Sequence, residues 1–251
     1  MRLFSKQIFL TSVGLVISGA GLADETQVAV AANFAEPIKA IAAVLEKTSG
    51  HKLKITLGAT GKLYAQIKNG APFDLLLAAN SAVPAALEQE GLTKPGNRFT
   101  YATGKLVLWS AEAARVDGRG DVLKSGSFRK VAYANPKTAP YGQAAVQVMA
   151  KMGLTQALTP KLVQGESIGQ AYSFVATGNA ELGFVAMSQV LEGGKLKSGS
   201  LWVIPQTLYS PIRQDAVLLQ RGVNNPAAQA LMKLLQSPNV KDLIRSYGYD
   251  I

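Results

Sequence analysis

Four short segments place small or hydroxyl-bearing residues where a strand is predicted to end and a helix to begin. They are Ala31-Ala32-Asn33-Phe34, Gly58-Ala59-Thr60-Gly61-Lys62, Ala139-Pro140-Tyr141-Gly142 and Gly165-Glu166-Ser167-Ile168. The first backbone N–H groups of a helix have no acceptor within the helix and carry the positive end of its dipole. Glycines let a ligand approach the backbone closely. This chemistry is suited to holding an anion.

Each of these loops is a weak signal alone, because most strand-to-helix turns only cap their helix. The segment GATGK (58–62) is the richest in glycine, but it lacks the glycine spacing and the Lys-Ser/Thr ending of a Walker-type phosphate loop. A kinase or ATPase is therefore not expected.

The composition removes most catalytic chemistry. The 251 residues include no cysteine and a single histidine, His51, which excludes disulfides, thiolate metal sites and sites built on several histidines. With a single histidine, the sequence offers no paired carboxylate-histidine set, so a secreted hydrolase is the weakest alternative. We expect a binding protein without a cofactor rather than an enzyme.

Strands and helices are predicted to alternate along the chain. Strands are expected at 27–32, 52–57 and 73–79, each followed by a helical pattern. Asn33 is expected to cap the first helix, with Glu36 completing a capping box. This order is typical of a parallel sheet with helices on both faces.

The pattern restarts after a turn-rich boundary at 93–104. Further strands are expected at 105–109, 131–134, 162–163, 182–187, 201–204 and 215–219, with helices between and after them. The late strand and helices suggest a return to the first unit. We therefore expect a discontinuous first lobe at 24–101 plus 207–251 and a second lobe at 102–206, with Tyr209, Arg213 and Asp215 near the return crossing or the cleft rim.

Residues 1–23 have the features of a cleaved signal peptide. Arg2 and Lys6 precede an apolar run from Ile8 to Leu22, and small residues lead up to Ala23. The apolar run is about 15 residues, short of the roughly 20 that a spanning helix needs. We expect the mature protein to be exported, most simply to a bacterial periplasm.

The formal net charge of +10, or +8 after Arg2 and Lys6 are removed, suggests an anionic partner. A nucleic-acid-binding protein is the alternative from a different class. The Lys and Arg residues of this chain are scattered rather than gathered on one helix or arm, so nucleic acid is not the expected partner.

Four stretches resemble the periplasmic molybdate-binding proteins of ABC transporters. They are VAVAANFAEPIKAI, GATGKLYAQIKNGAPFDLLLAA, NPKTAPYGQAA and LWVIP, and the resemblance runs from about Gln27 to Ile251. It implies a type II periplasmic binding protein fold of the α/β class, in which two lobes with mostly parallel sheets close on a ligand at the hinge. It also implies binding of molybdate or tungstate, delivery to an inner-membrane permease, and a monomer.

The resemblance places the oxyanion-binding residues at Ala32, Asn33, Thr60, Tyr141 and Ile168. Asn33 can donate through its side-chain amide, Thr60 through its hydroxyl, Tyr141 through its backbone and its phenol, and Ile168 through its backbone N–H. Some relatives offer a further hydroxyl where this chain has Ala32. Others place a tyrosine where it has Ala186, so those two donors are absent here. Sulfate, chromate and phosphate remain alternative ligands.

Overall fold

The structure is a computed structural model, and it describes residues 24–251. The signal peptide expected at 1–23 lies outside these residues. Within the described part, no helix is both long and apolar enough to cross a membrane.

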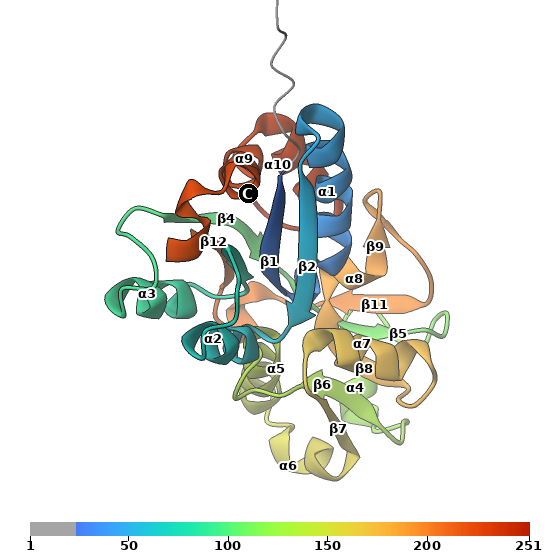
Figure 1. The fold of residues 1–251 in the computed structure, drawn as a ribbon. Helices are drawn as coiled ribbons and strands as arrows, with labels where there is room; N and C mark the ends of the chain where they lie inside the picture. The colour runs from blue at the N-terminus through green and yellow to red at the C-terminus, as the bar shows by residue number, and fades with distance from the viewer. Residues whose placement is uncertain (1–23) are drawn as a thin grey trace, which may run out of the picture.

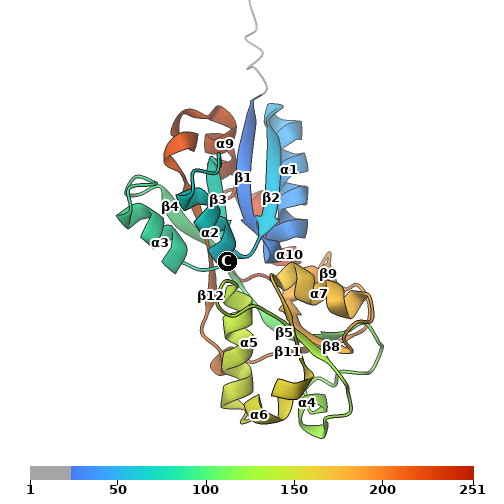
Figure 2. The same ribbon diagram turned by 60° about the horizontal axis from the view of Figure 1, so that its bottom comes forward.

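Two five-stranded sheets form the centres of two lobes (Figures 1 and 2). The first sheet has the order β2-β1-β3-β12-β4. Its strands are β1 (Glu25–Ala31), β2 (Lys52–Gly58), β3 (Leu75–Ala78), β4 (Arg98–Gly104) and β12 (Ile212–Leu218).

The second sheet has the order β11-β5-β8-β6-β7, and a two-stranded hairpin accompanies it. Its strands are β5 (Leu106–Ser110), β6 (Val131–Ala134), β7 (Leu162–Gly165), β8 (Leu182–Ala186) and β11 (Ser200–Val203), and the hairpin is β9 (Leu191–Glu192) with β10 (Lys195–Leu196).

Helices cover both sheets. The first lobe carries α1 (Ala35–Ser49), α2 (Thr60–Lys68), α3 (Ala82–Gln89), α9 (Pro226–Leu234) and α10 (Pro238–Ser246). The second lobe carries α4 (Val122–Ser125), α5 (Pro140–Lys151), α6 (Thr155–Leu158), α7 (Ile168–Ala176) and α8 (Met187–Val190). Short 3-10 turns lie at η1 (Ala32–Phe34), η2 (Thr159–Lys161), η3 (Gln206–Leu208) and η4 (Gln220–Asn224).

Each sheet is mixed, with the same internal plan. In the first sheet β1 pairs in parallel with β2 and β3, whereas β12 is antiparallel to β3 and β4. In the second sheet β6 pairs in parallel with β7 and β8, whereas β5 is antiparallel to β8 and β11. The two-lobed α/β fold is therefore confirmed. The antiparallel pairs are those that involve the strands next to the crossings between lobes.

Two local predictions were wrong. The turn-rich segment 93–104 contains strand β4, which pairs with β12 and lies at the edge of the sheet. Asn33 does not cap a helix, because the chain makes the 3-10 turn η1 before α1 begins, and neither helix start has a side-chain cap. Glu36 instead pairs with Lys39 at the exposed surface.

Several helix ends follow the sequence closely. Gly50 ends α1 in the left-handed conformation, with φ of 75°. Asn225 caps α9 by accepting a hydrogen bond from the Ala228 N–H, and Pro226 occupies the first turn.

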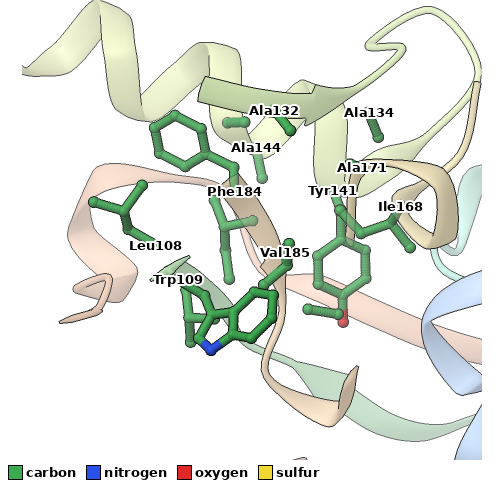
Figure 3. Packing of buried hydrophobic residues seen from close by; sticks show 14 of the residues in the cluster. Leu108, Trp109, Ala132, Ala134, Tyr141, Ala144, Ile168, Ala171, Phe184 and Val185 are labelled. Atoms are coloured by element: carbon green, nitrogen blue, oxygen red, sulfur yellow. The ribbon is translucent and has the colours of Figure 1, made fainter. Parts of the chain in front are cut away.

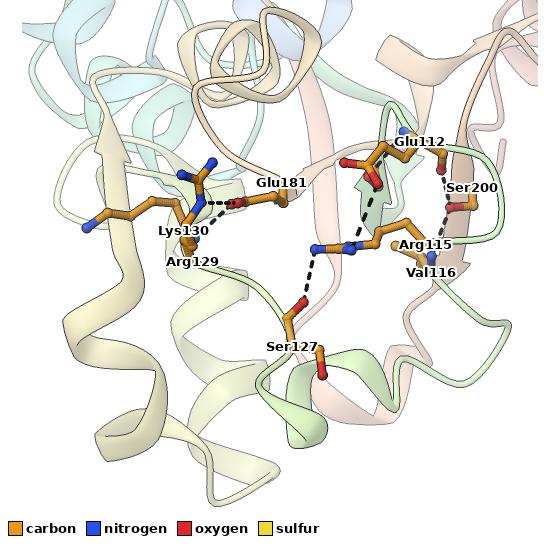
Figure 4. Close-up of polar contacts among 9 residues, drawn as sticks. Glu112, Arg115, Val116, Ser127, Arg129, Lys130, Glu181 and Ser200 are labelled. Atoms are coloured by element: carbon orange, nitrogen blue, oxygen red, sulfur yellow. Dashed lines mark hydrogen bonds and ion pairs between the residues drawn. The ribbon is translucent and has the colours of Figure 1, made fainter.

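A hydrophobic core centred on the second lobe includes the large side chains of Trp109, Phe184 and Tyr141 and reaches alanines of the first lobe (Figure 3). At the end of this lobe, Glu181 binds the Arg129 guanidinium at 2.8 Å and the Lys130 backbone N–H at 2.9 Å (Figure 4). Arg129 and Lys130 precede β6 and Glu181 precedes β8, so the carboxylate joins the starts of two neighbouring parallel strands.

Two segments join the lobes. The first runs from β4 directly into β5, and the second runs from β11 to β12. Tyr209 on the second segment accepts a hydrogen bond from the Leu106 N–H on the first at 3.0 Å, so it ties the two crossings together. Asp250 pairs with Thr103 beside the same place, and the C-terminus lies near the junction of the lobes (Figure 2). The lobe limits expected from the sequence remain a proposal.

Candidate functional site

A small cavity lies between the lobes, and all five residues singled out in the sequence line it. Ala32, Asn33 and Thr60 come from the first lobe, and Tyr141 and Ile168 come from the second. The cavity is small, about 10 Å³ in volume. The cavity therefore has room for a small inorganic species and not for an organic ligand.

Four helix or turn starts converge on this cavity. Ala32 and Asn33 open η1, Thr60 opens α2, Tyr141 lies in the first turn of α5, and Ile168 opens α7. Backbone N–H groups at such positions have no acceptor inside their own helix. The partial positive charge of each start is also directed to the same volume. The arrangement is suited to several hydrogen bonds to one anion.

The Thr60 hydroxyl already accepts a hydrogen bond from within the protein. Its Oγ1 accepts a hydrogen bond from the Ala79 N–H at 3.0 Å, and the side chain is buried. A hydroxyl has one proton to donate. The contact with Ala79 therefore leaves the proton of Thr60 available to a ligand in the cavity.

Asn33 lines the cavity with its backbone, while its side chain is engaged elsewhere. The side-chain nitrogen donates to Gln214 Oε1 and to Tyr249 Oη, both at 2.8 Å. These two bonds use both protons of the amide. Both protons of the Asn33 amide are therefore engaged within the protein here, and donation from this amide to a ligand stays a prediction.

A buried polar cluster holds the Asn33 turn from behind. The hydroxyls of Ser188 and Tyr249 both donate to the Asn33 carbonyl, at 2.7 and 3.0 Å. Burial raises the pKa of Tyr249 to about 12, so its proton is retained at neutral pH. Ser188 belongs to the second lobe, so this cluster connects the two lobes beside the cavity.

Tyr141 lines the cavity, but its phenol hydroxyl lies at the crossing between the lobes. The ring is fully buried, and Ile168 lies beside it (Figure 3). The hydroxyl is packed so tightly against Gly104 that a Cβ added there would lie 2.0 Å from Oη. Oη therefore rests on the crossing between lobes, close to the buried hydroxyl of Tyr249. Burial raises the pKa of this phenol well above its usual value.

Side chains of Lys, Arg, Asp and Glu are absent from the described residues that line the cavity. Lys62, which follows Thr60 and Gly61, pairs with Glu166 of the other lobe at 2.6 Å, and both side chains are about half exposed. This ion pair therefore joins the two lobes at the exposed edge of the cleft. The described residues also hold no group of three or more His, Cys, Asp or Glu placed to bind a metal ion directly.

Sequence reasoning missed the residues that support the site, namely Gln214, Ser188 and Tyr249. Gln214 and Tyr249 lie 181 and 216 positions from Asn33. No local pattern marks a contact over such a separation.

The fold and the cavity between its lobes define a bacterial extracellular solute-binding protein. The profile of that family matches residues 26–250, and the chain belongs to it. The chain is 58% identical over 243 residues to the molybdate-binding protein ModA of Azotobacter vinelandii, covering 94% of this chain and 96% of that one. It is 51% identical to the ModA protein of Rhodobacter capsulatus, covering 94% and 92%.

A solved structure gives the same result for the fold. The periplasmic molybdate-binding protein of Azotobacter vinelandii superposes with a TM-score of 0.87 at 39% identity, covering 90% of this chain and 99% of that one.

Proposed function

We propose that this protein binds molybdate, and also tungstate, in the cavity between its lobes. The observation that carries the proposal is the convergence of four helix or turn starts on one small cavity lined without charged side chains. The molybdate-binding proteins to which the chain is similar at 51–58% identity support it.

The chemistry of the cavity favours a fully deprotonated anion. A tetrahedral dianion accepts hydrogen bonds and donates none, which matches a wall of N–H groups and the Thr60 hydroxyl. A protonated phosphate would direct its own O–H at a donor, which costs free energy. Each charge-assisted bond contributes about 1.5–3 kcal/mol, and desolvating the dianion offsets part of their sum.

Selection against sulfate has to come from size, because sulfate carries the same charge. Sulfate is the smaller anion, so lobes held at the spacing that suits the longer Mo–O bonds would leave the hydrogen bonds to sulfate too long. The scattered basic residues supply only long-range attraction. Salt screens such attraction beyond about 10 Å at 0.1 M.

Calorimetric titration tests this proposal. The purified protein is freed of bound anion by unfolding, dialysis and refolding, and is then titrated with molybdate, tungstate and sulfate. We expect one tight site for molybdate and tungstate and much weaker binding of sulfate. Equal affinity for sulfate would favour the alternative of a sulfate, chromate or phosphate receptor.

We further propose that the protein acts in the periplasm as a monomer that delivers its ligand to an inner-membrane ABC permease and catalyses no reaction. Its closed form would be the one that docks, since the ligand binds both lobes. The mass of the protein isolated from the periplasm should correspond to a chain that begins at Asp24. A mass that includes residues 1–23 would contradict the proposed cleavage.

A further inference from the structure

We infer that Gly61 and Thr138 are positioning residues that set how closely the lobes approach around the anion cavity. This inference rests on the proposed function. Gly61 is in the first turn of α2, directly after Thr60, and Thr138 precedes α5 by two residues. The Gly61 N–H donates to the Thr138 carbonyl at 2.9 Å, which joins backbone to backbone across the cleft.

The contact leaves almost no room at Gly61. A Cβ added there would lie 3.1 Å from Thr138 Cα and 3.2 Å from Thr138 O. Both distances are shorter than ordinary van der Waals contact between such atoms. The absence of a side chain at Gly61 is therefore what allows the two backbones to meet in the closed form.

Neither backbone has an easy way to move aside. The N–H groups of Thr138 and Ala139 both donate to the Asn135 carbonyl, and the Asn135 N–H donates to Gly165 at 2.7 Å. On the other side, the N–H groups of Lys62 and Leu63 both donate to the Ala59 carbonyl. A methyl group at Gly61 would therefore move one lobe relative to the other instead of bending either loop.

Such a movement acts directly on the cavity. Thr60 lies next to Gly61, and Tyr141 lies three residues after Thr138, so the contact fixes the distance between two walls of the site. Holding the lobes apart by a few tenths of an ångström lengthens hydrogen bonds to the anion from one lobe or the other. Bound ligand is then released faster.

A second glycine at the cleft provides a matched comparison. Gly169, in the first turn of α7, also faces the opposite lobe, but a Cβ there would meet Ala32 Cβ at 3.4 Å, an ordinary contact. Gly118, in a loop of the second lobe, has open space around it and serves as a control away from the cleft.

The experiment compares Gly61→Ala, Gly169→Ala and Gly118→Ala with the parent in molybdate affinity, dissociation rate and melting temperature without ligand. We expect Gly61→Ala to bind about tenfold more weakly, mainly through faster dissociation. Its ligand-free melting temperature should be unchanged or higher, because alanine favours a helix over glycine. Gly169→Ala and Gly118→Ala should bind within about threefold of the parent.

The outcomes separate this inference from the proposed function. If the parent itself does not bind molybdate, the proposed function fails. If the parent binds and Gly61→Ala binds equally well, or if Gly169→Ala loses as much affinity as Gly61→Ala, the positioning role is wrong. A Gly61→Ala protein that melts well below the parent without ligand would also overturn it, because its defect would then lie in folding.

Discussion

At the scale of single residues, the site depends more on backbone atoms than on side chains. Asn33 and Tyr141 both line the cavity, yet the amide of Asn33 is bonded to Gln214 and Tyr249 and the phenol of Tyr141 rests on Gly104. The Thr60 hydroxyl accepts a hydrogen bond from Ala79 and keeps its proton for a ligand. Substitutions at these positions therefore have different expected effects.

Replacing Thr60 tests its hydroxyl. Thr60→Ala should weaken molybdate binding by about 10- to 100-fold, because a charge-assisted hydrogen bond contributes about 1.5–3 kcal/mol. Thr60→Ser keeps the hydroxyl and should stay close to the parent. Calorimetry of the three proteins decides the matter, and unchanged binding by Thr60→Ala would show that the site is misplaced.

Tyr141→Phe tests which part of Tyr141 acts. The backbone N–H remains and the phenol lies against Gly104 at the crossing between lobes, so molybdate affinity should stay within about threefold of the parent. Removing a buried hydroxyl that makes no well-aligned hydrogen bond should leave the free energy of unfolding equal or slightly higher. A tenfold loss of affinity in the same titration would mean that the phenol contacts the anion.

At the scale of elements, the sequence predicts best where burial and periodicity act locally. The buried strand β3 and the capped helix α9 follow from apolar runs and from Asn225-Pro226. Strand β4 was missed because its pairing with the distant β12 makes it a strand, whereas its own residues favour turns. The cap at Asn33 was mispredicted for the same reason, since distant partners take its side chain.

The link between β6 and β8 gives a prediction for stability. Burial acts to raise the pKa of Glu181, but hydrogen bonds from Arg129 and from backbone N–H groups outweigh it and lower the pKa to about 2. A carboxylate with a lowered pKa stabilises the fold above its unfolded pKa of 4.5, and this contribution is lost as pH falls toward 2.

Glu181→Gln should therefore lower the free energy of unfolding by about 1–2 kcal/mol at pH 7. The difference from the parent should shrink as pH falls from 4.5 toward 2. Urea unfolding of both proteins at several pH values measures this difference in the free energy of unfolding. Asp242→Asn, at an exposed ion pair within α10, serves as the control and should change stability little. A difference for Glu181→Gln that is the same at pH 3 and pH 7 would contradict the assignment.

At the scale of the whole molecule, the lobes meet through contacts of several kinds. They include the backbone bond from Gly61 to Thr138, the exposed pair of Lys62 with Glu166, and the buried cluster at Asn33. The helix starts that line the cavity could be found from the sequence one at a time. Their meeting depends on this closure, which no local pattern encodes.

Ligand that binds both lobes should stabilise both against heat. At a molybdate concentration about 1,000 times the Kd, the expected gain is about 4 kcal/mol, or roughly 8–16 °C in Tm for a chain of this size. Calorimetry should show the whole unfolding transition moving upward with molybdate. A shift confined to part of the transition would mean that only one lobe holds the anion.

The buried cluster behind Asn33 also bears on how the protein is made. The turn at Ala32–Phe34 belongs to the first elements synthesised, yet its partners Gln214 and Tyr249 lie near the other end of the described chain. A nascent chain that stops before Tyr249 lacks the hydroxyl that holds the Asn33 carbonyl and amide. The anion site is therefore completed only when the segment after α10 has emerged and folded back to the hinge.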